Sequence, residues 1–402
     1  MQGDLMPSST YPGTLSSRWA LSTRSFKRHL PRGLAGCTLA ALSALAIGAA
    51  QAAPPPDIEA GLQKIGRVVD PVCTAPLYRP LMPANDITSN LPQPYPGITV
   101  TRNQSFGPDP KDVVDLFVAD HGAASRTVLI FVPGGAGDKI EIQSKADNAF
   151  YDNIGRWAAQ HGMVGVLMQR KASPTWDGGA KDVSAMLQWV EAHIGAYHGN
   201  PDRMFLWAHS AGNVPMGTYL GHPELYGPNG VGVRGVIYMS GAPFDIAPVK
   251  PPVMTLGSVI GNAGQACGLQ GGMAAEMGAA GALPGVPPGS PGGPPLPRAA
   301  GGGPPGPPGG APPDAASQLA RSSLPVLRKA SFKMLIVNGE LDPVALVEFG
   351  RSLHDALCKA GPAHCPVRLI AKGESHMSLV FSIDSPDTTV SAPVLAFIHS
   401  TR

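Results

Sequence analysis

The ten residues MFLWAHSAGN, Met204 to Asn213, decide how this chain folds. The first five are apolar, as in a strand buried on both faces, and the next five are small or polar. An apolar strand, the motif A-x-S-x-G and a helix, in this order, form a sharp turn that exposes its serine. Ala208 and Gly212 keep bulky side chains out of the turn, and the amino end of the helix favours negative charge. We therefore predict that Ser210 is a nucleophile at the end of a buried strand, rather than an ordinary serine cap.

Apolar runs of the same kind recur on both sides of this stretch. Six of them are typical of strands buried on both faces: 127–132, 163–168, 204–208, 233–239, 332–337 and 367–371. Residues 98–106 and 113–119 alternate apolar and polar side chains, as an antiparallel pair with one solvated face would. Residues 181–194 carry one apolar stripe at helical spacing. Strands alternating with helices predict an α/β fold with a mostly parallel central sheet and helices on both faces.

The composition limits the number of domains. The chain has 402 residues, only 14% of them charged, with 50 Gly and 44 Pro, which argues against a coiled coil or a highly charged disordered chain. Between Gly281 and Pro313, 24 of 33 residues are Gly or Pro, and they lack the period of collagen. We expect one domain, residues 96–402, with a Gly/Pro-rich insertion at about 251–316, because strand signals resume after it. Residues 53–95 are expected to form a Pro-rich N-terminal extension.

The first 52 residues predict export. A basic stretch at 24–32, an apolar stretch at 34–50 and the small-x-small triplet Ala50-Gln51-Ala52 are typical of a secretory signal peptide. The alternative, a membrane anchor, needs about 20 apolar residues. The formal net charge is +2, and the basic excess lies in this segment, so the remainder predicts no nucleic-acid partner and no stable membrane anchor. We expect a periplasmic or secreted protein that acts on a neutral small molecule; the sequence leaves its oligomeric state open.

Four cysteines follow the predicted signal: Cys73, Cys267, Cys358 and Cys365. They allow three pairings. We favour Cys358 with Cys365, because the residues between them form a short Gly/Pro loop, and this leaves Cys73 to pair with Cys267. Zinc sites use motifs such as C-x-x-C or His/Cys clusters at fixed spacing, and the sequence has neither, so we predict no metal.

A serine hydroxyl becomes a nucleophile when a base takes its proton and a third group orients that base. In a fold with the turn described above, the acid and then the histidine follow the serine, each after a strand. Asp342 follows the run at 332–338 and His376 follows the run at 367–371, so we predict Asp342 and His376 as the partners of Ser210. The alternatives are Glu340 or Asp384 as the acid and His364 as the base.

A glycine-rich stretch, PGGAGDK at residues 133–139, follows the run at 127–132. Glycines allow several backbone N–H groups to converge on one point. We predict that the amides of Gly135, Ala136 and Ala211 form an oxyanion hole. The stretch lacks the Gly-Lys-Ser/Thr of a phosphate loop, an ordinary glycine turn is the alternative, and we expect no cofactor.

Residues 98–213 resemble the esterase/lipase branch of the α/β-hydrolases, which includes hormone-sensitive-lipase-like and feruloyl-esterase-like enzymes. Residues 114–117 (VDLF) look like its early Leu-Asp-Val-Tyr strand, and residues 134–139 look like its Gly-rich loop ending in Gly-x-Lys. Asp182 and Trp189 match its helix before Asn-Pro-Asp-Arg at 200–203. Two positions depart from the branch, which usually has His-Gly-Gly-Gly: Pro133 replaces the histidine and Ala136 the third glycine.

The resemblance implies an α/β-hydrolase fold with the Gly/Pro-rich insertion before the last strands. It also implies hydrolysis of carboxylic esters through Ser210, His376 and Asp342, with an acyl-enzyme intermediate. The same three residues would suit a lactone, thioester, amide or polyester, because a fold does not encode the acyl group. A non-catalytic binding protein that kept the fold is the alternative of another class.

Overall fold

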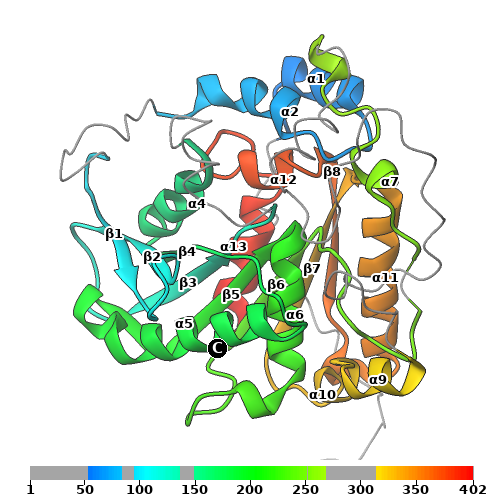
Figure 1. Ribbon diagram of the computed structural model, residues 1–402. Helices are drawn as coiled ribbons and strands as arrows, with labels where there is room; N and C mark the ends of the chain where they lie inside the picture. The colour runs from blue at the N-terminus through cyan, green and yellow to red at the C-terminus, as the bar shows by residue number, and fades with distance from the viewer. Residues whose placement is uncertain (1–52, 84–94, 136–148, 251, 269–313, 402) are drawn as a thin grey trace, which may run out of the picture. The chain divides into compact units, whose positions relative to one another are not determined.

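A computed structural model describes residues 53–83, 95–135, 149–250, 252–268 and 314–401 (Figure 1). All of them belong to one of the two units into which the chain divides, Gly48–Arg402. The predicted signal peptide and most of the predicted insertion lie outside the described residues. The predicted domain boundaries therefore stay predictions.

One eight-stranded sheet, in the order β1-β2-β4-β3-β5-β6-β7-β8, forms the centre of the described residues (Figure 1). The strands are β1 (Ile98–Ser105), β2 (Val113–Ala119), β3 (Arg126–Val132), β4 (Val164–Met168), β5 (Gly199–His209), β6 (Gly235–Met239), β7 (Lys333–Leu341) and β8 (Val367–Ser375). The first two pair antiparallel, β2 is also antiparallel to β4, and the other pairs are parallel. This confirms the predicted α/β fold with its mostly parallel sheet, and the parallel strands bring their carboxyl ends to one edge.

Helices cover both faces of the sheet, because alternate side chains of each strand point to opposite sides. The longer ones are α1 (Pro56–Ile65), α2 (Pro71–Tyr78), α4 (Ala149–Gln160), α5 (Gly178–His193), α6 (Asn213–Gly221), α11 (Val344–Cys358) and α13 (Ser391–Ser400). Short helices are α7 (Leu256–Ile260), α9 (Ala315–Ala320), α10 (Leu324–Leu327) and α12 (Ser378–Phe381). Leu129 and Phe131 of β3 share one apolar core with α4 and α13, and Val128 and Ile130 share the other with α5 and α6.

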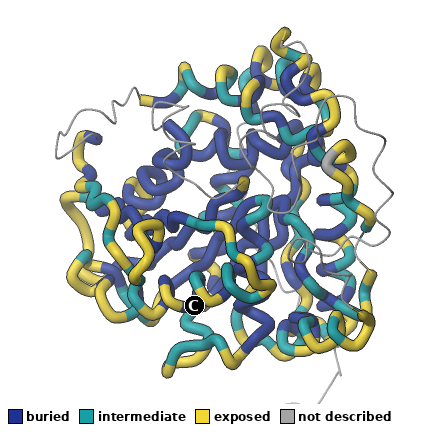
Figure 2. Tube along the Cα trace, viewed as in Figure 1, coloured by how far each residue is buried: buried dark blue, intermediate teal, exposed yellow. Residues whose placement is uncertain are grey.

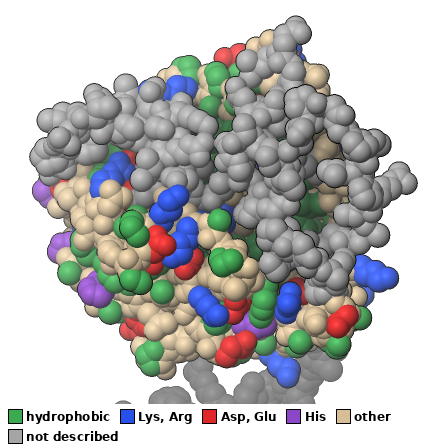
Figure 3. Space-filling view, viewed as in Figure 1, with side chains coloured by type: hydrophobic (Ala, Val, Ile, Leu, Met, Phe, Trp, Pro, Cys, Tyr) green, Lys and Arg blue, Asp and Glu red, His purple; other side chains and the backbone are tan. Residues whose placement is uncertain are grey.

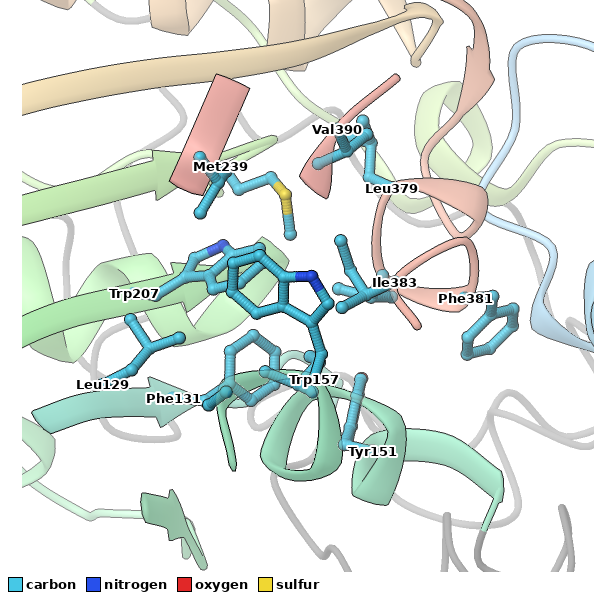
Figure 4. Close-up of a cluster of buried hydrophobic side chains, with 14 of the residues drawn as sticks. Leu129, Phe131, Tyr151, Trp157, Trp207, Met239, Leu379, Phe381, Ile383 and Val390 are labelled. Carbon is cyan, nitrogen blue, oxygen red and sulfur yellow. The ribbon is translucent and has the colours of Figure 1, made fainter. Parts of the chain in front are cut away.

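Aromatic side chains fill the first of these cores (Figure 4). Trp207 of β5 packs edge to face against Phe131 of β3, with ring centroids 5.7 Å apart, and Trp157 of α4 packs against Trp207 with ring centroids 6.1 Å apart. Such pairs contribute about 0.5 to 1.5 kcal/mol beyond the area that they bury. Figure 2 shows the same region as continuously buried chain. This packing holds the central strands, and thus their carboxyl ends, in fixed positions.

The edge strand β8 differs from the prediction that residues 367–371 are buried on both faces. Val367 is 62% exposed and Ile370 is 41% exposed. The reason is the position of β8, which pairs with β7 on one side and ends the sheet on the other. An apolar run alone does not distinguish an edge strand from a central one. Within β8, Ala371 and the last three residues, Gly373 to Ser375, are buried.

The N-terminal extension contains two helices, which its Pro-rich, weakly periodic sequence did not indicate. Pro occupies the first turn of α1 and of α2, where its missing N–H costs nothing. The Asp70 side chain caps α2 by accepting from Cys73 N at 2.9 Å, and its other oxygen accepts from Gly264 N at 2.8 Å. In Figure 1 these helices lie beside β8 and α12. The extension is therefore part of the folded unit.

Both predicted disulfides form, Cys73 with Cys267 and Cys358 with Cys365. They close chain segments of very different length, since the cysteines are 194 and 7 residues apart. In the chain-entropy description, a longer closed loop restricts the unfolded chain more.

Removing the long-range disulfide should therefore destabilise the protein more than removing the short one. We expect the Cys73→Ala/Cys267→Ala variant to lose about 5 kcal/mol of unfolding free energy, and Cys358→Ala/Cys365→Ala about 2.5 kcal/mol. Urea titrations of the two double variants and the wild type measure this difference. Equal losses would contradict the expectation.

None of the helices within the described ranges has the length and apolar character needed to cross a bilayer. On the face seen in Figure 3, acidic and basic side chains lie intermixed over the coloured part of the surface.

Candidate active site

The predicted turn at Ser210 forms directly after β5. Ser210 has φ of +52°, a conformation that is uncommon for residues with a side chain, and α6 follows one turn later. Gly212 lies against the neighbouring strand, where an added Cβ would clash with the Val132 carbonyl oxygen. The Ser210 carbonyl accepts from Ala242 N at 3.0 Å and from Asn213 Nδ2 at 3.1 Å. These contacts fix the strained turn and leave Ser210 half-buried at the edge of the sheet.

Two side chains from other strand ends form a chain of contacts that begins at Ser210, in the order that the sequence predicts. His376 follows β8, and its Nε2 lies 2.9 Å from Ser210 Oγ. Asp342 follows β7, and its Oδ1 lies 3.1 Å from His376 Nδ1. Both side chains are fully buried. The structure thus brings together the three residues that the sequence analysis selected.

A second serine, Ser240, touches the same imidazole from its other side. Its hydroxyl donates to Asp342 Oδ1 at 2.6 Å, and its Oγ lies 2.8 Å from His376 Nδ1. A proton on Nδ1 would therefore lie between two oxygen acceptors. Ser240 follows β6 directly and has φ of +41°. The sequence analysis missed it, although a polar residue at the end of a strand between those of Ser210 and Asp342 was a usable signal.

Asp342 is held by its own loop. Its Oδ2 accepts from Gly339 N at 2.8 Å and from Asn338 Nδ2 at 3.3 Å. Its carbonyl accepts from Arg67 Nη1 at 3.1 Å, a contact from the N-terminal extension. The two bonds to Oδ2 orient the carboxylate toward His376, and the bond from Arg67 holds the backbone of the loop.

His209, directly before Ser210, supports the turn. Its Nε2 lies 3.0 Å from the His376 carbonyl, which can only accept, so the proton is on Nε2. Burial, and then the nearby His376, hold the pKa of His209 well below its usual value. The neutral ring packs against His376 with ring centroids 4.6 Å apart. His209 therefore fixes the backbone of His376 without adding charge.

The glycine-rich loop lies against the turn, but only its first part is described. A Cβ on Gly134 would meet Ser210 Cβ at 2.8 Å, so only glycine fits there. Arg170, two residues after β4, donates to the carbonyls of Pro133 at 2.7 Å and Gly135 at 2.6 Å. Among the predicted oxyanion donors, Gly135 and Ala211 border this region, and Ala136 lies outside the described residues.

The alternative acids and base have other partners. Glu340 accepts from Gly373 N at 2.8 Å, and Asp384 forms an ion pair with Arg156. His364 lies in the short helical turn η6 (Pro362–His364), inside the loop that the disulfide of Cys358 closes. His354 lies near both sulfur atoms of that disulfide, but they are bonded to each other. The prediction that the protein binds no metal stays a prediction.

A buried acid, Glu374, lies two residues before His376. Burial, and then the neighbouring Asp387 carboxylate, hold the pKa of Glu374 well above its usual range. Ser378 donates to Glu374 Oε2, and Tyr78 of α2 donates to Asp387 at 3.3 Å. This cluster joins the N-terminal extension to the segment that carries His376.

The raised pKa of Glu374 makes stability depend on pH. In the unfolded chain Glu374 has a pKa near 4.5 and loses its proton above that pH, whereas in the native state it stays protonated to a higher pH. The unfolding free energy should therefore fall as the pH rises above about 4.5, by up to about 1.4 kcal/mol per pH unit. Glu374→Gln removes this titration and should flatten the slope in urea titrations at pH 5, 6 and 7. Glu340→Gln, which alters an exposed carboxylate, should keep the wild-type slope; parallel slopes for wild type and Glu374→Gln would contradict the expectation.

Comparisons with known proteins give one family match and several similar folds. Residues 162–265 match the Carboxylesterase family, a segment that spans β5, Ser210 and β6. The structure resembles a hyperthermophilic esterase from the archaeon Pyrobaculum calidifontis, with 14% sequence identity, TM-score 0.50, and coverage of 87% of this chain and 98% of that one. It also resembles esterase B from Lactobacillus rhamnosis, with 14% identity, TM-score 0.49, and coverage of 76% and 86%. No curated protein matches the sequence.

At such low identity, the likeness to the Pyrobaculum structure carries the fold, and the family match concerns the segment around Ser210. The match does not distinguish the hormone-sensitive-lipase-like branch from other esterases. The chain has the α/β-hydrolase fold, and its carboxylesterase-family segment supports its placement among the carboxylic ester hydrolases.

Proposed function

We propose that this protein is an exported serine esterase, in which Ser210 attacks the ester carbonyl, His376 is the general base and acid, and Asp342 orients His376. The observation that carries the proposal is the unbroken set of contacts from Ser210 Oγ to His376 Nε2, at 2.9 Å, and from His376 Nδ1 to Asp342, at 3.1 Å. Both distances suit hydrogen bonds along a proton path.

The reaction follows from these contacts. As the Ser210 oxygen bonds to the ester carbonyl carbon, its proton moves to His376 Nε2 and the carbonyl oxygen becomes an oxyanion. The tetrahedral intermediate collapses, the bond to the alcohol oxygen breaks, and His376 gives that oxygen its proton. Water then attacks the acyl-enzyme in the same way and releases the acid. Asp342 stabilises the imidazolium that forms twice in the cycle.

The oxyanion needs donors that are already in place. The amides of Gly135, Ala136 and Ala211 are proposed for this role, and the contact of Gly134 with Ser210 supports it. Loss of one such donor in other serine hydrolases costs about 2.7 to 4 kcal/mol.

Export is the second part of the proposal. The two disulfides support it, because such bonds persist in oxidising compartments. The proposed substrate is an ester of a neutral small molecule, and no cofactor enters the reaction.

The proposal is tested by incubating the mature protein with a short-chain p-nitrophenyl ester, beside lactone, thioester and amide panels and an alkyl fluorophosphonate probe. We expect ester hydrolysis and stoichiometric labelling. If the protein is labelled by the probe but hydrolyses only the lactone, thioester or amide substrates, that bond would replace the ester in the proposal. A folded protein that takes no probe would favour the non-catalytic binding protein.

Ser240 has a measurable part in this scheme. Ser240→Ala removes a hydrogen bond to the Asp342 carboxylate, and bonds to charged groups contribute about 1.5 to 3 kcal/mol. We expect kcat to fall about ten- to a hundredfold, with KM little changed, in steady-state assays. An unchanged kcat would show that Asp342 and His376 keep their positions without the Ser240 hydroxyl.

A further inference from the structure

Arg170 lies at the glycine-rich loop, and its guanidinium binds three successive backbone carbonyls there. It donates from Nε to Pro133 O at 2.7 Å, and from Nη2 to Gly134 O at 3.3 Å and to Gly135 O at 2.6 Å. In the part of the chain that the structure describes, no acidic side chain forms an ion pair with it. Among the described residues, its hydrogen-bond partners are thus carbonyls of the loop.

These carbonyls are covalently linked to the proposed oxyanion donors. The peptide unit that contains Gly134 C=O also contains the N–H of Gly135. A peptide unit is planar, and in the trans form its C=O and N–H point in opposite directions. A group that holds the oxygen of such a unit therefore also sets the direction of its N–H.

We propose that Arg170 is a positioning residue for the oxyanion hole: by binding the Gly134 and Gly135 carbonyls it holds the glycine-rich loop and aims the N–H of Gly135 at the transition state. This inference rests on the proposed function. Glycines make the orientation costly to maintain without such a partner, because Gly135 has φ of +58° and no side chain that could restrict it.

The guanidinium also acts electrostatically. Burial lowers the pKa of Arg170 to about 10, so it is still a cation at neutral pH. A positive charge on the carbonyl side of a peptide unit polarises the unit and strengthens N–H donation on the other side, as in other hydrogen-bond chains. This effect increases when negative charge develops on the substrate oxygen, so it acts on the transition state more than on bound substrate.

The chain provides a matched control in Arg126, at the amino end of β3. Arg126 is buried, at 4% exposure, and also donates to two backbone carbonyls, Ala123 O and Ala119 O, each at 2.8 Å. It lies at the opposite end of the strand that leads into the glycine-rich loop. Arg126→Met and Arg170→Met both remove a guanidinium that binds backbone carbonyls. If Arg170 has only a structural role, the two variants should therefore affect kcat alike.

The experiment compares the esterase kinetics of wild type, Arg170→Met, Arg170→Lys and Arg126→Met, together with their affinity for an alkyl boronic acid that forms a tetrahedral adduct with serine. For Arg170→Met we expect kcat about 10²-fold lower with KM within threefold. Boronate affinity should fall by a similar factor, with Arg170→Lys intermediate. For Arg126→Met we expect kcat within threefold and a lower urea midpoint.

A folded Arg170→Met with kcat within threefold of wild type would overturn the inference, as would a loss confined to KM or an equal loss in Arg126→Met. Where Arg170→Met does not fold, Arg170→Lys decides: a tenfold lower kcat supports the role, and an unchanged kcat overturns it. A wild type that neither hydrolyses esters nor takes the fluorophosphonate is a different result, because it removes the proposed function before any variant is compared.

Discussion

Replacing Ser210 with alanine is expected to lower kcat for ester hydrolysis by about 10⁶-fold and to abolish labelling by a fluorophosphonate. Without Ser210 Oγ, His376 Nε2 has no hydroxyl to deprotonate, and the acyl-enzyme cannot form. The remaining rate, about 10³- to 10⁴-fold above that in water, would come from the oxyanion donors and substrate binding. Steady-state assays and mass spectrometry of the labelled peptides measure both effects.

This test also separates the two serines that contact His376. Ser210 lies at Nε2, and Ser240 lies at Nδ1 between the ring and Asp342. Ser240 is fully buried, whereas Ser210 is half-buried, so we expect the wild-type adduct on the peptide that contains Ser210. An adduct on Ser240, or label retained by Ser210→Ala, would show that Ser210 is not the nucleophile.

The strand ends were predictable because the physics behind them is local. The run that ends at Ala208 is apolar throughout, and a short continuous apolar run is typical of a strand that is buried on both faces. Parallel pairing then brings the ends of β5, β7 and β8 to one edge, so residues placed just after these strands are candidates to meet. Ser210, Asp342 and His376 were selected in this way, and their side chains do lie together.

The contacts around these residues depend on which strands are neighbours in the finished sheet, and a residue pattern within one strand does not give that. Ser240 follows β6, the strand between β5 and β7, so its position at a strand end was a signal that the sequence analysis did not use. Arg170 reaches the glycine-rich loop because β4 lies beside β3, although 37 residues separate it from Pro133. The exposure of β8 has the same origin, since an edge position is a property of the finished sheet.

The second large effect concerns the acid. Asp342→Asn is expected to lower kcat by about 10⁴-fold while the fold is kept, because asparagine has the same shape and its oxygen can still accept from Gly339 N. Its NH₂ group, facing His376 Nδ1, would favour the tautomer that carries the proton on Nε2. That nitrogen could then no longer accept the proton of Ser210. Steady-state assays give kcat, and urea titrations verify the fold.

Glu340 is the matched control, since it lies two residues earlier on β7 and the sequence left it as an alternative acid. Its carboxylate accepts from Gly373 N at 2.8 Å. We expect Glu340→Gln to keep kcat within about threefold of wild type, because an uncharged amide oxygen can accept from the same N–H. A loss near 10⁴-fold in Glu340→Gln with a nearly active Asp342→Asn would transfer the role of the acid to Glu340. Since His376 Nδ1 lies 3.1 Å from Asp342 and the charge must act on that atom, the structure favours the opposite result.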